Sequence, residues 1–428
     1  LVAPARKAEL ESLMSLRFGF FTTFYPPFHF GGDAIGVERL VKALAARGHE
    51  VTVVHDADAF RTLNGPEPKS TDEPTTNVRA IRLESAIPFV SNLLTHQTGR
   101  NLAHGRTLSR IIEEGRFDVL WYNNMSLVGG HALLREGNAL KVYEAHEHWL
   151  VCPTHVLWRF GRERCDEKRC LPCQASYRRP PQLWRGSADF ERSLDAIDLF
   201  IAKSRFSRDK HAEFGFTRPM EVIPYFLPPA TGATQEFARP QERPYFLFVG
   251  RLEKIKGLQD VFPSFSGEGT ADLVVIGSGE YEGELKSQAA SMQRVKFLGR
   301  KPSDELAQWY AHAQALIVPS ICYETFGIII IEAFRQGTPV IARKLGPFPE
   351  IIEASSGGML FSDKAELDAA LARVADDFAL RAELSQKALH AFRAIWTEDV
   401  VLAQNFDALA RAAHRKGDAA LARRLESF

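Results

Sequence analysis

The chain has 428 residues, a length that favours two or three domains over a single hydrophobic core. Hydrophobic residues make up 45% and charged residues 25%, as in an ordinary globular protein. Lysine plus arginine equals aspartate plus glutamate at 53 each, so the basic excess typical of nucleic-acid-binding domains is missing and we expect no nucleic-acid partner. No run approaches the roughly 18 apolar residues of a membrane-spanning helix.

Residues 1–15 mix charges of both signs and have no apolar run like that of a signal peptide. Met14-Ser15 stands directly before the first expected strand, so we interpret residues 1–15 as an upstream extension or a remnant of cloning. Five cysteines in a chain of this length do not make a secreted disulfide scaffold. We therefore expect a cytoplasmic protein.

The first half of the chain alternates between strand and helix patterns. A strand over 17–22 leads into a loop rich in proline and glycine, then into a helix with apolar residues at helical spacing that ends near Gly48. A strand over 51–54 completes a β-α-β unit, the start of a parallel sheet covered by helices. Further strands are expected at 78–83, 119–122, 141–144 and 199–202.

The second half restarts after residues 228–244, which have the composition of a linker. Two doubly wound, Rossmann-like α/β domains are therefore predicted to face each other across a cleft, with the ligand at the carboxyl ends of the strands. The expected strands lie at 245–249, 273–276, 295–298, 315–318 and 339–342, and the end is helical from about 398 to 424. The predicted divisions are an N-terminal, acceptor-side domain at 16–221 with a cysteine-rich insertion near 152–185, a C-terminal nucleotide-sugar domain at 222–395, and helices at 396–428 that pack back on the first domain.

Two glutamates with seven residues between them give the sharpest signal for function. Glu324 follows a buried strand, and Gly327 with Ile328 begins a helix whose first N–H groups lack partners within the helix and suit a phosphate. Glu332 lies a turn further on, where its carboxylate can accept hydrogen bonds from ribose hydroxyls. The alternative is that Glu332 only begins a solvated helix face, but the four preceding isoleucines predict a largely buried helix.

A second loop carries two cations. Gly250 ends a buried strand and lets the chain turn close to a ligand. Arg251 and Lys256 follow five residues apart and can flank a diphosphate, the arginine with its planar fork and the lysine as a point charge. A solvated turn is the alternative interpretation, and it fits Lys254 best.

Two glycine-containing loops follow other strands. Gly31-Gly32 precedes the first helix, where backbone N–H groups can approach a phosphate or a sugar from the opposite side of the cleft. The segment from Gly277 to Gly283 misses the dinucleotide fingerprint by one position, because residue 282 is a glutamate. We interpret it as a tight turn beside the donor and not as an NAD site.

Together these motifs resemble the two-domain retaining glycosyltransferases of family four, a group that includes sucrose and sucrose-phosphate synthases. The match covers about 16 to 410 and is most specific in the Glu-x7-Glu segment, continued to Val340, and in the loop at 250–257. The resemblance implies a fold of GT-B type and a hexosyltransferase. Such an enzyme moves a sugar, with retention, from a UDP- or GDP-sugar to a glycan, lipid-linked or small-molecule acceptor.

The resemblance also implies roles for single residues. In that family the arginine and lysine hold the donor diphosphate, here Arg251 and Lys256. The first glutamate binds the transferred sugar, here Glu324, and the second binds the ribose, here Glu332. The remaining donor contacts implied by the family pattern come from Gly31, Gly32, Gly250, Gly277, Gly299, Arg300, Gly327 and Ile328.

The segment from Glu144 to Trp149 resembles the His-Asp-x-Trp loop of the same family, with Glu147 in place of the commoner aspartate. There the histidine lies beside the reacting sugar, so His146 is expected to be catalytic. A lone histidine is more often structural when judged from the residue itself. Val222-Ile-Pro-Tyr225 departs from the usual Ile-Pro-Asn-Gly of the family.

Retention without an obvious protein nucleophile fits front-face attack. The leaving phosphate then accepts the proton of the acceptor, while Arg251, Lys256 and the helix N-terminus stabilise its charge. No metal or other cofactor is required for this chemistry. Asp56-Ala-Asp58 matches the Asp-x-Asp metal motif of the other glycosyltransferase fold, but it follows the second strand of this one and we assign it to a loop.

Four cysteines fall within 22 residues and are called the cysteine cluster: Cys152, Cys165, Cys170 and Cys173. Their spacing suits a structural, tetrahedral zinc site, with an iron–sulfur centre or four reduced thiols as alternatives. Their surroundings are basic and aromatic, which fits an acceptor surface, a peripheral contact with the inner face of a membrane, or a solvated insertion.

Three functions compete with a transferase. Two are a nucleotide-sugar epimerase and a glycan phosphorylase on the same fold. The third is a metal-containing protein that binds a sugar nucleotide without transferring it. Neither of the first two needs both the Glu-x7-Glu segment and the His-Glu-x-Trp loop, and intact Arg251, Lys256, Glu324 and Glu332 speak against the third.

Overall fold

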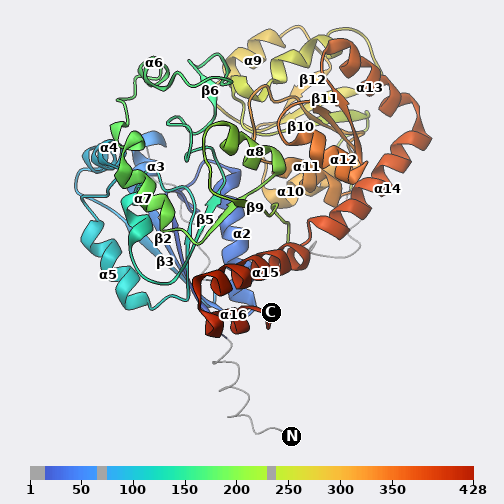
Figure 1. Ribbon diagram of the computed structural model, residues 1–428. Coiled ribbons are helices and arrows are strands. Elements are labelled where there is room, and N and C mark those ends of the chain that lie inside the picture. The colour runs from blue at the N-terminus through green and yellow to red at the C-terminus, as the bar shows by residue number, and fades with distance from the viewer. Residues whose placement is uncertain (1–14, 65–74, 229–237) are drawn as a thin grey trace, which may run out of the picture.

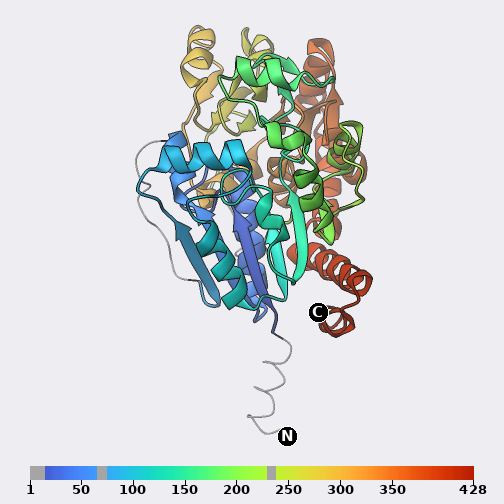
Figure 2. The ribbon, with the colours of Figure 1, turned by 60° about the vertical axis from the view of Figure 1, so that its left-hand side comes forward.

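The computed structural model describes residues 15–64, 75–228 and 238–428. It has two α/β domains, each built on a parallel sheet with helices on both faces, as Figures 1 and 2 show. The predicted fold class is confirmed. The expected extension at residues 1–15 lies outside the described residues except for Ser15, and so does most of the expected linker.

The first sheet has the strand order β3-β2-β1-β4-β5-β8-β9, and every neighbouring pair is parallel. Its central strands are mostly apolar and are buried on both faces, as expected of a sheet covered by helices on both sides. The strands are β1 (Arg17–Thr22), β2 (Glu50–Asp56), β3 (Val78–Leu83), β4 (Val119–Tyr122), β5 (Leu140–Ala145), β8 (Leu199–Ala202) and β9 (Met220–Val222). The helices between them are α2 (Gly32–Ala46), α3 (Ala57–Asn64), α4 (Pro88–Thr98), α5 (Gly105–Gly115), α7 (Ala188–Asp195) and α8 (Arg205–Glu213), with short 3-10 turns η1 (Ala132–Arg135) and η2 (Leu183–Gly186).

The cysteine-rich insertion forms a small subdomain of its own between β5 and α7. It holds an antiparallel pair of strands, β6 (Trp158–Arg159) and β7 (Glu163–Arg164), followed by the short helix α6 (Cys170–Ser176).

The second sheet has the order β12-β11-β10-β13-β14-β15 and is also parallel throughout. Its strands are β10 (Tyr245–Val249), β11 (Asp272–Ile276), β12 (Val295–Phe297), β13 (Leu316–Val318), β14 (Val340–Arg343) and β15 (Gly358–Phe361). Its helices are α9 (Glu282–Gln288), α10 (Ser303–His312), α11 (Ile328–Arg335), α12 (Phe348–Ser355), α13 (Lys364–Asp376) and α14 (Phe378–Ile395), and the 3-10 turns η3 (Lys254–Lys256), η4 (Leu258–Asp260) and η5 (Phe262–Phe265) follow β10.

The chain then returns to the first domain through α15 (Glu398–Lys416) and α16 (Ala419–Leu425), drawn in red in Figure 2. Helices were expected at 396–428, and Gly417 separates the two that are present. Apolar side chains of both helices, among them Phe406 and Leu421, belong to the same buried core as β1 and α2. Arg424 fixes α16 further by donating to Asp118 Oδ1 (2.7 Å) and to the carbonyl oxygen of Ser15 (2.6 Å).

Candidate active site

Four strand-end loops of the second domain, those after β10, β11, β12 and β13, approach one another closely. Gly277 N–H donates to the carbonyl oxygen of Gly299 (2.9 Å), and a Cβ added to Gly277 would lie 1.9 Å from the carbonyl oxygen of Gly250. Gly257 has a φ of 71°, and a Cβ there would lie 2.1 Å from the carbonyl oxygen of Pro319. Side chains at Gly257 and Gly277 would therefore push these loops apart, so the close approach requires glycine.

The glycine pair of the first domain closes over these loops. A Cβ on Gly31 would lie 3.8 Å from Arg251 Nε, and a Cβ on Gly32 would lie 3.3 Å from Ile328 Cδ1. Residues predicted from separate motifs thus meet across the domain boundary. Gly327 is the N-cap residue of α11 and has no side-chain cap, and Ile328 begins the helix, so the N-terminus of α11 lies close to the glycine pair. Arg300 stays exposed, and its charge acts on His29 in the loop before Gly31.

Lys256 and Glu324 form an ion pair, with 2.6 Å between Nζ and Oε1 and about one-fifth of each side chain exposed. Ser320 Oγ donates to the same carboxylate oxygen at 3.0 Å. Burial, the largest single influence, would raise the pKa of Glu324, but the charge and hydrogen bond of Lys256, together with Ser320 and Arg251, lower it. Burial would lower the pKa of Lys256, but Glu324 and Cys322 together raise it. Both groups are therefore charged at neutral pH. Arg251 is half exposed, with Nη1 2.6 Å from Glu253 Oε1.

Glu332 holds two protein donors. Arg39 Nη2 from α2 lies 3.1 Å from Glu332 Oε1, and Tyr310 Oη donates to Oε2 at 3.1 Å. The predicted ribose ligand is thus tied to the first domain across the cleft. Neither Arg39 nor Tyr310 was predicted from the sequence, because each lies within a helix and belongs to no motif.

His146 is buried, and both of its ring nitrogens meet protein groups. Nδ1 forms a short hydrogen bond with Tyr225 Oη, and Nε2 lies 2.9 Å from Asn123 Oδ1. Its loop is held by a buried ion pair in which Lys203 Nζ lies 2.5 Å from Glu144 Oε1. Burial would raise the pKa of Glu144, but Lys203 and His146 hold it well below its usual value.

Tyr225 was not predicted as a site residue, although it is the residue at which the sequence departs from the family pattern. Its ring packs so closely on α2 that a Cβ on Gly36 would lie 2.4 Å from Cε1. Lys203 Nζ lies 4.5 Å from the centre of the same ring. The departure therefore supplies a partner for His146. Glu147 of the same loop points elsewhere, with Oε2 2.9 Å from His155 Nδ1.

The loop that carries Glu324 is fastened to the first domain on both sides. Thr325 Oγ1 donates to the carbonyl oxygen of His146 (2.9 Å), and Ser204 Oγ donates to the carbonyl oxygen of Thr325 (2.7 Å). Tyr323 packs against the buried part of the cysteine cluster and forms a short hydrogen bond with Asp166 of the insertion. The two domains thus share the loop that presents Glu324.

All four members of the cysteine cluster are free thiols, and all but Cys170 are buried. Burial raises the pKa of Cys165 to about 11, and the other three cysteines add to that effect, so the four lie near one another. Among the residues that the structure describes, no group of three or more histidine, cysteine, aspartate or glutamate side chains is arranged so that it could hold a metal ion. Bound zinc or iron remains a prediction.

The assignment of Asp56 and Asp58 to a loop is wrong. Asp56 ends β2 and Asp58 belongs to α3. Asp56 Oδ1 accepts a hydrogen bond from Ala59 N–H at 3.1 Å, and Asp58 Oδ2 accepts one from Ser85 N–H at 2.7 Å. Their carboxylates thus hold backbone groups in place.

Comparison with known families agrees with this arrangement. The family described as "Glycosyltransferase Family 4" matches residues 30–230, and "Glycosyl transferases group 1" matches residues 233–390, so the two matches lie on either side of the domain boundary. Glycogen synthase of Mycobacterium tuberculosis is 28% identical over 389 residues, which cover 82% of this chain and 84% of that protein.

Two solved structures share the whole fold. Sucrose-phosphate synthase from Thermosynechococcus elongatus aligns with a TM-score of 0.69 at 19% identity, over 95% of this chain and 100% of that one. HepE of Anabaena, in complex with UDP-glucose, aligns with a TM-score of 0.61 at 17% identity, over 96% of this chain and 100% of that one. With two family matches in tandem and the GT-B fold, the chain belongs to the family-four glycosyltransferases.

Proposed function

We propose that the protein is a retaining hexosyltransferase that takes its sugar from a nucleoside-diphosphate sugar. The observation that carries this proposal is the meeting of Gly31-Gly32 with Arg251 and the start of α11, beside the charged pair of Lys256 and Glu324. Cations, free helix N–H groups and a carboxylate are the groups that a diphosphate and a sugar require.

In the proposed reaction Lys256, Arg251 and the first N–H groups of α11 stabilise the charge that develops on the leaving diphosphate. Glu324 stays ionised through Lys256 and accepts hydrogen bonds from hydroxyls of the transferred sugar. The acceptor attacks the anomeric carbon from the face on which the diphosphate leaves, and the departing phosphate oxygen takes the acceptor proton. His146, oriented by Tyr225 and Asn123, lies on the first-domain side of the same cleft.

The ribose is assigned to Glu332, which accepts from Arg39 and Tyr310 in this structure. Ribose hydroxyls would replace one or both of these donors. Of the two candidate donors we favour a UDP-sugar over a GDP-sugar, because HepE, which shares the fold, binds UDP-glucose.

None of the helices in the described parts of the chain is long and apolar enough to cross a lipid bilayer. We propose a cytoplasmic enzyme, in keeping with its free thiols, that works at the inner surface of the membrane.

A product analysis tests the proposal. The protein is incubated with a panel of UDP- and GDP-sugars, and donor binding is first detected as a rise in Tm, since a ligand that binds the native state stabilises it. The donor that binds is then tested for release of nucleoside diphosphate, and the product is examined by NMR. A product with the anomeric configuration of the donor is expected. An inverted product, an epimerised donor sugar, or phosphorolysis would each contradict the proposed activity.

A further inference from the structure

Helix α4 carries its apolar side chains on the outside. Ser91, Asn92 and Thr95 are at most 5% exposed, although they are polar. The outward side chains, with Ile87 just before the helix, are apolar, and their exposed fractions are 62% for Ile87, 63% for Phe89, 43% for Val90, 37% for Leu93 and 40% for Leu94. An ordinary surface helix has the opposite arrangement. A contiguous exposed apolar patch of this kind marks an interaction surface.

The orientation of α4 is fixed from below. Asn92 Nδ2 donates to Thr62 Oγ1 of α3 at 3.0 Å, and Trp184 Nε1 of η2 donates to the carbonyl oxygen of His96 at 2.9 Å. Turning the helix to bury its leucines would break the hydrogen bond between Asn92 and α3 and would bring the buried polar side chains of α4 to the surface. The apolar face therefore stays outward in the folded protein.

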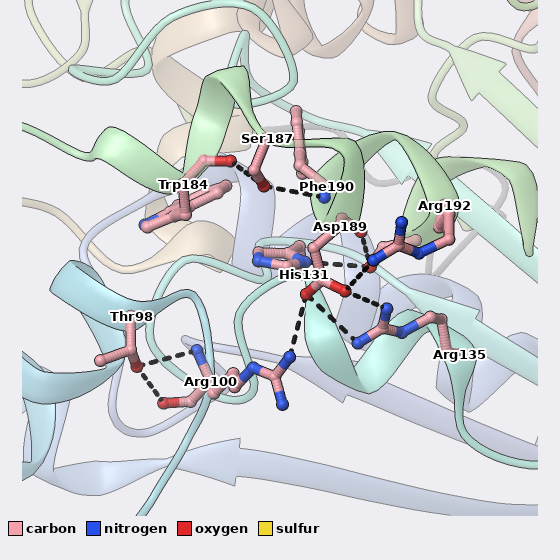
Figure 3. A network of polar contacts seen from close by, with 10 residues as sticks. Thr98, Arg100, His131, Arg135, Trp184, Ser187, Asp189, Phe190 and Arg192 are labelled. Carbon is pink, nitrogen blue, oxygen red and sulfur yellow. Dashed lines mark hydrogen bonds and ion pairs between the residues drawn. The ribbon is translucent and has the colours of Figure 1, made fainter.

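The end of α4 is anchored to the rest of the domain, as Figure 3 shows. Arg100, just after the helix, shares the carboxylate of Asp189 with Arg135 and Arg192, at nitrogen–oxygen distances of 3.0, 2.5 and 3.0 Å. Hydrogen bonds from Arg135 and the other two arginines hold the pKa of Asp189 well below its usual value. The charge of Arg100 is therefore already used within the protein.

Free positive charge comes from the neighbouring segment. Trp184 of η2 donates to the carbonyl oxygen of His96 in α4 at 2.9 Å, and Gln97 donates to the carbonyl oxygen of Pro180 at 3.4 Å. This contact places a further exposed leucine and two exposed arginines beside the helix. Together they form what we call the α4 surface: Ile87, Phe89, Val90, Leu93, Leu94 and Leu183 (77% exposed), with Arg178 and Arg179.

The α4 surface lies one helix away from the glycine loop that precedes α2. Figure 1 shows α4 on the outer side of the first domain, next to α3. Phe60 of α3 packs on Phe30 with ring centroids 5.0 Å apart, and Phe30 directly precedes Gly31. One helix thus separates the apolar surface from the glycine loop.

We propose that the α4 surface docks on a membrane that contains anionic phospholipid. Exposed aromatic and aliphatic side chains enter the boundary between headgroups and acyl chains, while arginines bind anionic headgroups. It follows, if the proposed transferase activity holds, that the acceptor is a lipid-borne molecule whose polar group projects from the membrane into the cleft.

Vesicle binding tests the docking surface independently of activity. The full chain is sedimented with vesicles of phosphatidylcholine alone or of phosphatidylcholine mixed with phosphatidylglycerol. The variant is Phe89→Ser with Leu93→Ser, and the matched control is Phe378→Ser, because Phe378 is 73% exposed on α14 in the other domain. We expect wild type and control to bind the anionic vesicles, and the double variant to bind on the order of tenfold more weakly. Arg178→Glu with Arg179→Glu should remove the preference for phosphatidylglycerol.

Two readouts separate this proposal from the proposed function. The Tm and the rate of donor hydrolysis by water should be unchanged in the double variant, because none of its positions touches the donor site. Equal vesicle binding by wild type and double variant would overturn the membrane proposal, as would a wild-type protein that does not bind vesicles. A dimer that dissociates on the double substitution would show that a second copy of the chain covers the surface, and this too would overturn it. Absent donor turnover with intact vesicle binding would count against the transferase alone.

Discussion

Replacing Lys256 with alanine tests the donor site, because this side chain is expected both to bind the diphosphate and to neutralise Glu324. The change removes one cation from the diphosphate, and it leaves the half-buried Glu324 without the partner that now lies 2.6 Å away. The two effects are measured in different quantities, turnover and stability. The exposed Lys254, on the same loop, provides a matched control as Lys254→Ala.

Turnover should fall strongly. Removing one preorganised group that stabilises charge in the transition state costs about 10²–10³-fold in kcat, or about 2.7–4 kcal/mol. Stability should fall as well, since breaking a fully buried ion pair costs about 3–5 kcal/mol. The side chains here are 20% and 23% exposed, so water screens part of the cost and about 1–3 kcal/mol is expected. For a domain of about 150–250 residues, each kcal/mol lost lowers Tm by about 2–4 °C.

The loss of stability should depend on pH. In the wild type the lowered pKa of Glu324 contributes stability above the unfolded pKa, and that contribution is lost as pH falls through the folded pKa. Without Lys256 burial dominates and raises the pKa, so the ionised carboxylate destabilises the variant as pH rises. The difference in Tm between wild type and variant should therefore be small in acid and grow toward neutral pH. Adding Glu324→Gln should recover part of the stability but none of the turnover.

Steady-state kinetics of nucleoside-diphosphate release and Tm measured over a pH series check these expectations. Wild-type turnover in Lys256→Ala would refute the donor-site assignment. A loss of the same size in Lys254→Ala would show that the loop, and not the one cation, is what matters.

Three further predictions concern other parts of the molecule. Glu332→Ala should weaken nucleoside-diphosphate affinity in calorimetry while Glu324→Ala mainly slows transfer, and unchanged affinity in Glu332→Ala would remove the ribose role. Burial raises the pKa of Asp56 to about 7, so the stability that this carboxyl group contributes in acid is lost as pH rises through that value. Asp56→Asn should therefore raise Tm by an amount that grows from about pH 4 to 7 and then stays constant. A gain in Tm that does not depend on pH would contradict this. The metal hypothesis, which the described cysteine side chains do not support as they are arranged, predicts about one zinc per chain in anaerobically purified protein. Thiol modification should then release the zinc with loss of turnover before unfolding, because Tyr323 packs there, and elemental analysis without stoichiometric zinc or iron would end the hypothesis.

The sheets could be predicted because buried parallel strands are written as unbroken apolar runs. Val119–Tyr122, Leu199–Ala202 and Tyr245–Val249 are such runs and lie where the sequence predicted them. Met220–Val222 and Gly358–Phe361 were missed because each is an edge strand of only three or four residues, too short to show a strand period. Edge strands of this kind are defined by the neighbour they join.

The site was predictable in its glycines and charges but not in its partners. Motif spacing brought out Gly31-Gly32, Arg251 and Lys256, and the fold places them around one cleft. Arg39 could not be linked to Glu332, because 293 residues separate them and an arginine on a helix usually faces solvent. Tyr225 left only a weak signal, as a departure from a family pattern whose meaning emerged from its contact with His146.

The return of α15 and α16 to the first domain has a consequence for synthesis. The core that holds Phe18 and Val37 also holds Phe406 and Leu421, which leave the ribosome hundreds of residues later. Domains generally fold as units during translation, the N-terminal one first. Here part of the apolar core of the first domain stays uncovered until α15 and α16 have been synthesised, so the second domain completes its core before the first does. A nascent chain stalled before Glu398 should therefore protect the second sheet from protease while the first remains open to cleavage and to chaperones.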